Sequence, residues 1–125
     1  HCAANQVLYN VGSRGIEYDL LPLMRQHQIP VMAYCPLAQA GRLRRGLLNH
    51  PALRQIAGEH HATVPQILLA FLLAQPGVLP IPRTGSAQHA QQNAAAAEIR
   101  LSAEELALLD AAFPKPKRKT RLEIV

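Results

Sequence analysis

Three short apolar runs, at residues 3–9, 30–35 and 78–82, constrain the fold of this chain more than any other feature of its sequence. Their apolar residues are nearly continuous instead of alternating, which is typical of strands covered on both faces in a parallel sheet. Stretches with the spacing of helices separate the runs, so their order predicts the repeated strand–helix units of an α/β protein. Three strands are too few to close a barrel or to hide their own edges, and we expect this sheet to be part of a larger one.

The segments between the first three strands differ in how clearly they predict structure. Apolar residues at three- and four-residue steps predict a helix over residues 16–27, although Pro22 inside it disfavours a continuous one. Residues 38–50 carry weaker signals, and we expect a loop there with at most one helical turn.

The later helices have identifiable start signals. Pro51 suits the first position of a helix that runs to about residue 59, and Pro65 suits the start of the apolar helix that follows. Ser86 is suited to cap a third helix, and the capping box at residues 102–105 predicts a fourth that ends near residue 113. The chain then closes with a basic tail, residues 114–125.

Length and composition indicate one small folded domain, since 49% of the 125 residues are hydrophobic. The two cysteines, Cys2 and Cys35, lie far apart, which favours a reducing cytoplasm over a disulfide-bonded secreted scaffold. No apolar run reaches the ~20 residues that a membrane span needs. The adjacent His60 and His61 diverge on a helix, so we expect no metal site.

The chain also contains four motifs in a recognisable order: NQVLYN, PVMAYCPLAQ, GVLPIPRTGS and LSAEELALLDAAFP. Together they resemble the C-terminal portion of an aldo-keto reductase, from about Asn5 to the end of the chain. The resemblance implies that the three strands are the sixth, seventh and eighth of a TIM (β/α)8 barrel. Residues 1–125 would then be a C-terminal fragment of one barrel domain, with 114–125 as its closing tail and a separate N-terminal portion as its partner. Such barrels place their chemistry at the C-terminal ends of the strands.

The resemblance implies an NADPH site after the third strand. The family binds the 2′-phosphate and adenine there with a cationic residue, a neighbouring hydroxyl and side chains of the next helix, and a helix N-terminus with a forked guanidinium suits a phosphate. In this chain the implied contacts are Arg83, Thr84, Ser86, His89, Gln92 and Asn93. Arg83 replaces a more common lysine, and His89 replaces a second phosphate-binding arginine, which weakens the preference for a 2′-phosphate near neutral pH. Without the resemblance, the first three would be read as a surface cluster at a helix start.

The resemblance also implies a nicotinamide site on the first two strands. Tyr34 matches the tyrosine whose ring stacks on the nicotinamide, and Gln6 matches the residue that hydrogen-bonds the carboxamide. Taken alone, each would be read as an ordinary strand residue. Cys35 replaces a serine that contacts the pyrophosphate, and Leu37 would still offer its backbone. The pair Ala40–Gly41 stands where two glycines are frequent, so the shape of this loop differs from the usual one.

No catalytic residue can be assigned in this sequence. The family uses an aspartate, a tyrosine that acts as general acid, a lysine and a histidine, all on strands that would precede residue 1. We therefore expect a complete form to reduce an aldehyde or ketone to an alcohol with NADPH, and this fragment to be inactive alone. A barrel without its first strands would also expose inward-facing apolar residues, which we expect to be Val7, Val31, Met32, Val78 and Ile81.

Two other functions stay open at this point. The net charge of +5 and the tail KPKRKTR would suit a module that binds a polyanion. Only 4% of the residues are aromatic, however, which leaves little for base stacking and disfavours nucleic acid. The second alternative is a remnant without a function of its own.

Overall fold

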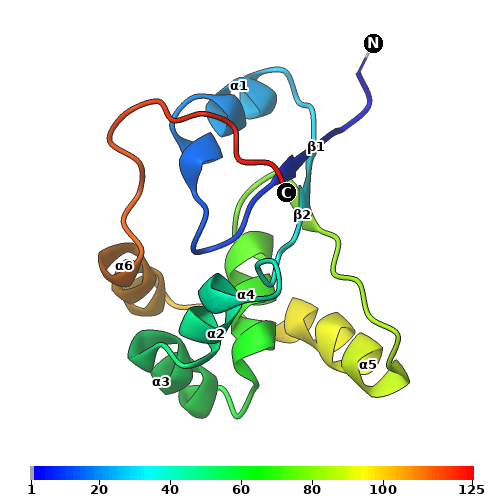
Figure 1. The fold of residues 1–125 in the computed structure, drawn as a ribbon, viewed down its shortest axis with the longest axis vertical. Helices are drawn as coiled ribbons and strands as arrows, with labels where there is room; N and C mark the ends of the chain where they lie inside the picture. The colour runs from blue at the N-terminus through cyan, green and yellow to red at the C-terminus, as the bar shows by residue number, and fades with distance from the viewer. Residues whose placement is uncertain (1) are drawn as a thin grey trace.

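The computed structural model describes residues 2–125, and its three strands form one parallel sheet in the order β1-β2-β3 (Figure 1). The strands are shorter than the apolar runs that predict them: β1 Asn5–Leu8, β2 Val31–Tyr34 and β3 Val78–Pro80. Their type, number and parallel pairing confirm the predicted strand–helix units. Within the described residues no helix is long and apolar enough to cross a membrane.

Helices fill the connections between the strands and follow the last one. Their bounds are α1 Leu20–Gln26, α2 Arg42–Leu48, α3 Pro51–Glu59, α4 Val64–Leu73, α5 Ala87–Ala95 and α6 Ala103–Ala112, with 3-10 helices at Gly15–Glu17 and Ala96–Glu98. The predicted caps are confirmed. The Ser86 and Ser102 side chains each accept from the backbone N–H three residues on, and Glu105 completes the capping box of α6. A further capping box, Thr63 with Gln66, starts α4.

Two expectations about the helices were wrong. Instead of one helix over 16–27, the chain forms the 3-10 helix Gly15–Glu17 and then α1, which begins only at Leu20. Pro22 then lies in the first turn of α1, where a backbone N–H has no partner inside the helix and a proline costs little. The segment 38–50, expected to be mostly loop, contains the seven-residue helix α2.

The two faces of the sheet are assigned by strand register. Side chains alternate between faces along a strand, and Asn5, Val31 and Val78 form one row across the sheet. The face that carries this row packs into the core beneath the helices, and its core residues are Val7, Val31, Ala33 and Val78. The expectation that Val7, Val31 and Val78 line the barrel interior was therefore wrong.

The opposite face of the sheet is open, and Leu79 on it is 53% exposed. The residues on this face are Gln6, Leu8, Met32, Tyr34 and Leu79. Met32 lies on the predicted face and is half-buried, whereas Ile81, also half-buried, lies beyond the end of β3.

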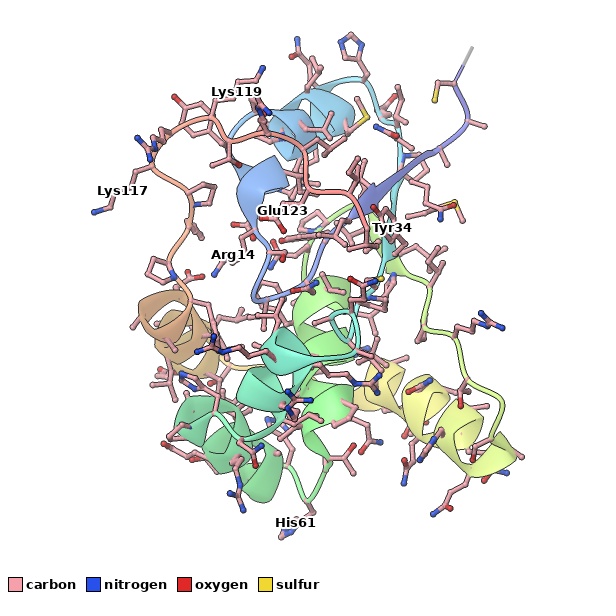
Figure 2. The ribbon with its side chains drawn as sticks, in the orientation of Figure 1. Arg14, Tyr34, His61, Lys117, Lys119 and Glu123 are labelled. Carbon is pink, nitrogen blue, oxygen red and sulfur yellow. The ribbon has the colours of Figure 1, made fainter. Side chains whose placement is uncertain are left out.

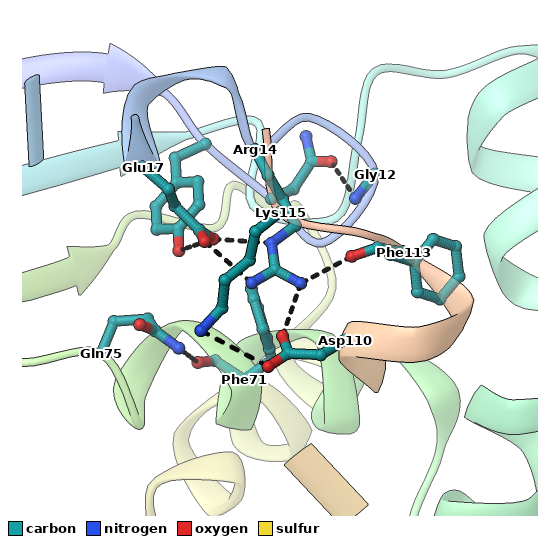
Figure 3. Close-up of polar contacts among 10 residues, drawn as sticks. Gly12, Arg14, Glu17, Phe71, Gln75, Asp110, Phe113 and Lys115 are labelled. Carbon is teal, nitrogen blue, oxygen red and sulfur yellow. Dashed lines mark hydrogen bonds and ion pairs between the residues drawn. The ribbon is translucent and has the colours of Figure 1, made fainter. Parts of the chain in front are cut away.

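A buried arginine joins the loop after β1 to two distant helices (Figure 3). The Arg14 side chain is 5% exposed and pairs with both carboxylate oxygens of Glu17, at 2.7 and 2.8 Å. Its Nη1 also donates to the carbonyl of Phe113 at 2.7 Å and pairs with Asp110 at 2.8 Å. The guanidinium carbon lies 5.1 Å from the ring centre of Phe71 on α4. One side chain thereby fixes the loop against both α4 and the end of α6.

The hydrogen bonds around Arg14 and Glu17 stabilise the charged form of Arg14 and the neutral form of Tyr9. Burial by itself lowers the pKa of Arg14, but the hydrogen bonds with Glu17 and Asp110 outweigh it and raise that pKa overall. Burial also raises the pKa of Tyr9, whose hydroxyl donates to Glu17 at 2.6 Å. Arg14 therefore stays charged and Tyr9 stays neutral over the physiological pH range.

The C-terminal tail, residues 114–125, crosses α1 and ends near β1 (Figure 1). Lys119 pairs with Asp19 at 2.9 Å, just before α1 begins (Figure 2). Beside it, Thr120 approaches Gly15 so closely that a Cβ on Gly15 would lie 2.5 Å from its Oγ1. A side chain at position 15 would therefore force the Thr120 side chain to shift. Further on, the tail lines an apolar cavity of about 320 Å³ together with Leu8 on the open face of the sheet.

The arrangement around Arg14 predicts a large stability loss when its charge is removed. Arg14→Met should lower the free energy of unfolding by about 3–5 kcal/mol, since it leaves the carboxylate of Glu17 buried without its cationic partner. Urea denaturation followed by circular dichroism measures this. The control is Lys115→Met, which removes only an exposed ion pair to Asp110 at 3.5 Å and should cost less than about 1 kcal/mol. Equal costs for the two variants would contradict the central role of Arg14.

The open face of the sheet predicts self-association of this chain by itself. Leu79 is exposed there beside an unpaired strand edge, and burying it against another copy removes apolar surface from water. Sedimentation velocity at several concentrations should show oligomers that Leu79→Ser reduces. Leu73→Ser is the matched control, because Leu73 is 40% exposed on α4, which packs against the other face of the sheet. A chain that stays monomeric at every concentration would disprove this prediction.

Candidate functional site

A cavity of about 320 Å³ lies beside the loop that leads from β3 into α5. Four separate segments of the chain contribute to it: the loop after β2, helix α2, the start of α4, and the β3–α5 connection with α5 itself. The lining residues are Leu37, Arg44, Thr63, Pro65, Arg83, Thr84, His89, Gln92 and Asn93. Six of the ten residues predicted from the sequence to bind a cofactor therefore lie around one cavity, although Leu37 is 46 positions before Arg83.

The loop between β3 and α5 is held by its own hydroxyl groups. The Thr84 side chain accepts from the backbone N–H of Ser86 at 3.1 Å, and the Ser86 side chain accepts from that of His89 at 3.3 Å. Ser86 itself does not line the cavity. Its role in the structure is to cap the nine-residue helix α5, whose positive end lies beside the exposed Arg83.

Helix α5 is attached to the core through α4. The side-chain amide of Gln66 in α4 donates to the backbone carbonyl of Gln92 at 3.1 Å. This contact holds the turn of α5 that carries Gln92 and Asn93, both half-buried at the cavity wall. The wall is therefore fixed to the folded core instead of standing free in solvent.

Gln6 and Tyr34 lie on a different part of the molecule from this cavity. Gln6 pairs with Met32 across the sheet and Leu8 pairs with Tyr34, so both side chains point to the face opposite the helices. Tyr34 is the last residue of β2 (Figure 2) and is half-buried, whereas Gln6 is exposed. The two residues predicted to contact one end of a cofactor thus share a face, and neither lines the cavity.

The loop after β2 connects these two regions and has an unusual backbone. Cys35 and Ala38 both have left-handed conformations, with φ of 49° and 60°, and Gly41 has φ of 128°. The Cys35 carbonyl accepts from the side chain of Asn10 at 3.1 Å and from the N–H of Ala38 at 2.9 Å. Cys35 is a half-buried free thiol, and Cys2 is also free. This loop directs Leu37 to the cavity.

The sequence reasoning missed three residues that line the cavity, Arg44, Thr63 and Pro65, and one that supports it, Asn10. Arg44 lines the cavity from α2, and Asn10, 1% exposed, positions the loop after β2. Asn10 follows a strand and lies two residues before Gly12, so its sequence context indicates only a turn. Arg44 belongs to a segment expected to be a loop, and nothing local distinguishes it from Arg42 or Arg45.

The charge of the cavity suits an anion. Arg44 and Arg83 are cationic, His89 can become so, and none of the lining side chains in the described part of the chain carries a carboxylate. Residues 2–125 contain no group of three His, Cys, Asp or Glu side chains placed to hold a metal ion. The cavity is therefore cationic, and hydroxyl and amide groups surround it.

These observations first define a class of protein. Parallel strands followed by helices, with a cationic cavity beyond the carboxyl end of the last strand, form a segment of an α/β barrel with its site in the usual place. The chain belongs to the aldo/keto reductase family, whose model matches residues 1–113. It is 56% identical over 124 residues to the methylglyoxal reductase YeaE of Escherichia coli, and this match covers 99% of the chain and 44% of that protein.

Solved structures agree with the partial barrel. The chain is similar to an aldo-keto reductase from Klebsiella pneumoniae in complex with NADPH, with 60% identity and a TM-score of 0.95. An aldo/keto reductase from the same organism, in complex with NADP and acetate, matches at 59% identity and a TM-score of 0.96. Each match covers the whole chain and 44% of the solved chain, so this chain spans less than half the length of these relatives.

Proposed function

We propose that this chain provides the cofactor-binding part of an NADPH-dependent reductase that converts an aldehyde or ketone to an alcohol. The observation that carries the proposal is the cavity that brings Leu37, Arg83, Thr84, His89, Gln92 and Asn93 together. Its charge is unbalanced and positive, as a phosphate group requires, and the related structures from Klebsiella pneumoniae contain NADPH or NADP. NADPH, when bound, supplies the hydride.

In this proposal the β3–α5 connection binds the adenosine end of the cofactor. Arg83 offers a forked pair of donors for the 2′-phosphate, and the hydroxyl of Thr84 adds a donor beside it. The N–H groups and positive end of α5 act in the same direction. Gln92 and Asn93 offer amide groups to the adenine ring, and the hydrogen bond from Gln66 to Gln92 keeps this wall in place.

The open face of the sheet binds the nicotinamide end. The Tyr34 ring covers one side of the nicotinamide, and the amide of Gln6 pairs with the carboxamide. Gln6 and Tyr34 lie on the same face of the sheet, as contact with one nicotinamide group requires. The backbone at Cys35 and Leu37 lies between the two ends and contacts the pyrophosphate. Its conformation is held by Asn10 and Ala38, so it is fixed before a ligand arrives.

The relatives extend beyond the part that this chain matches. In this proposal the proton donor of the reaction lies in that remaining part. Together with that N-terminal portion the chain would complete a barrel and its substrate site. Both cysteines are free thiols, which supports a cytoplasmic protein. The polyanion alternative receives less support, because two cations of the basic tail are paired within the chain, Lys115 with Asp110 and Lys119 with Asp19.

Cofactor preference gives the first test. The chain should bind NADPH more tightly than NADH, and Arg83→Ala should remove most of this difference. One charge-assisted phosphate contact is worth roughly 1.5–3 kcal/mol, which corresponds to a loss of about ten-fold or more in affinity. Titration followed by the fluorescence of the reduced cofactor measures it.

Arg54→Ala is the control for this titration, since Arg54 is an exposed arginine of α3 that does not line the cavity. Its affinities should match those of the unaltered chain. Equal affinities of the unaltered chain for NADPH and NADH would contradict the proposed site. Absence of binding to either cofactor would favour the remnant alternative.

Activity gives the second test. The chain by itself should not oxidise NADPH in the presence of a reactive aldehyde, because hydride transfer to a carbonyl needs an acid to protonate the developing alkoxide and no such acid is assigned here. The absorbance of NADPH follows the reaction. A turnover near one per second or faster, the lower end of ordinary enzymes, would show that this chain contains its own proton donor.

A further inference from the structure

The cavity beside α5 contains a cation that no sequence motif indicates. Arg44 comes from α2 and lines the same cavity as the β3–α5 connection, which carries Arg83. Within residues 2–125 neither arginine side chain makes a hydrogen bond or an ion pair, and no carboxylate lines the cavity. Two guanidinium groups therefore share one cavity of about 320 Å³ without a counter-charge from this part of the protein.

Arg44 differs from the other arginines of its helix. Arg42 and Arg45 are exposed, whereas Arg44 is half-buried and lies at the cavity wall. Partial burial next to another cation is unfavourable unless an anion is bound, because like charges repel more strongly where water is partly excluded. The position of Arg44 is thus one that a bound anion would stabilise.

The neighbours of Arg44 indicate which end of a dinucleotide this anion belongs to. The cavity contains Thr84, His89 and Asn93 of the adenosine end, and it contains neither Gln6 nor Tyr34 of the nicotinamide end. The imidazole of His89 lacks the forked donors of a guanidinium, so it is a weaker second partner for a phosphate than an arginine. A cation from another element is needed to complete the site.

We propose that Arg44 is a second binding residue for the 2′-phosphate of NADPH and contributes to the preference for NADPH over NADH. This inference rests on the proposed function, because it assumes that the cavity binds the adenosine end of the cofactor. It adds to the phosphate site a contact from α2, an element separate from the β3–α5 connection that carries Arg83. The guanidinium fork of Arg44 suits two phosphate oxygens at once, as a lysine ammonium does not.

The test uses two small probes that differ only in the 2′-phosphate: adenosine 2′,5′-bisphosphate and adenosine 5′-monophosphate. Each is titrated calorimetrically into the chain and into Arg44→Ala and Arg44→Gln variants. Both substitutions should lower the affinity for the bisphosphate roughly ten-fold and leave the affinity for the monophosphate within about two-fold. Arg45→Ala, on the same helix but exposed and outside the cavity, is the matched control and should change neither affinity.

The possible outcomes separate this inference from the proposed function. A bisphosphate preference that survives both Arg44 substitutions would overturn the role of Arg44 and leave the proposed function standing. Equal losses for both probes would assign Arg44 to the 5′-phosphate and also overturn the inference. An unaltered chain without any preference for the bisphosphate would overturn both. Circular dichroism of each variant verifies folding, and Arg44→Gln keeps most of the side-chain stem if the alanine variant is unstable.

Discussion

The buried guanidinium of Arg14 is the contact on which the geometry of the site depends. It ties the loop after β1 to Glu17, to Asp110 and to the carbonyl of Phe113, over the ring of Phe71. Burying such a charge costs desolvation that the ion pairs offset only when their geometry is good, so its clearest effect is to hold one arrangement of these segments. A purely apolar contact would allow the loop to shift against α4 and α6.

This arrangement extends from Arg14 to the cavity beside α5 through a short series of contacts. Ser13, next to Arg14, pairs through its backbone with Asn10, and the side chain of Asn10 donates to the carbonyl of Cys35. That hydrogen bond stabilises Cys35 in a left-handed conformation that side chains rarely adopt. The chain then turns toward Leu37 and α2. The loop after β1 thereby determines the course of the loop after β2, although 25 residues separate Asn10 from Cys35.

The cavity itself combines a stable frame with an unbalanced charge. Helices α4 and α5 are joined by the Gln66–Gln92 hydrogen bond, and six of the ten residues of α4 are buried. The cations Arg44 and Arg83 both line the cavity beside this frame, and no carboxylate of residues 2–125 lines it with them. The frame is held by contacts in which neither cation takes part.

The sequence by itself determined the features that depend on near neighbours in the chain. Three parallel strands, the caps at Ser86 and Ser102, and the placement of Arg83 at a helix start follow from apolar runs and from turn and capping residues within a few positions. The family resemblance added Gln6 and Tyr34, whose common face agrees with the strand register.

Only the tertiary structure decided which face of the sheet each strand residue occupies and which distant segments meet. The strands are apolar on both faces, so nothing in their pattern distinguishes Val31, which packs beneath the helices, from Met32, which does not. Arg44 has Arg42 and Arg45 near it in sequence, and its place in the same cavity as Arg83 arises from the packing of α2 near α4. Register and long-range packing are properties of the whole chain, and a local pattern does not contain them.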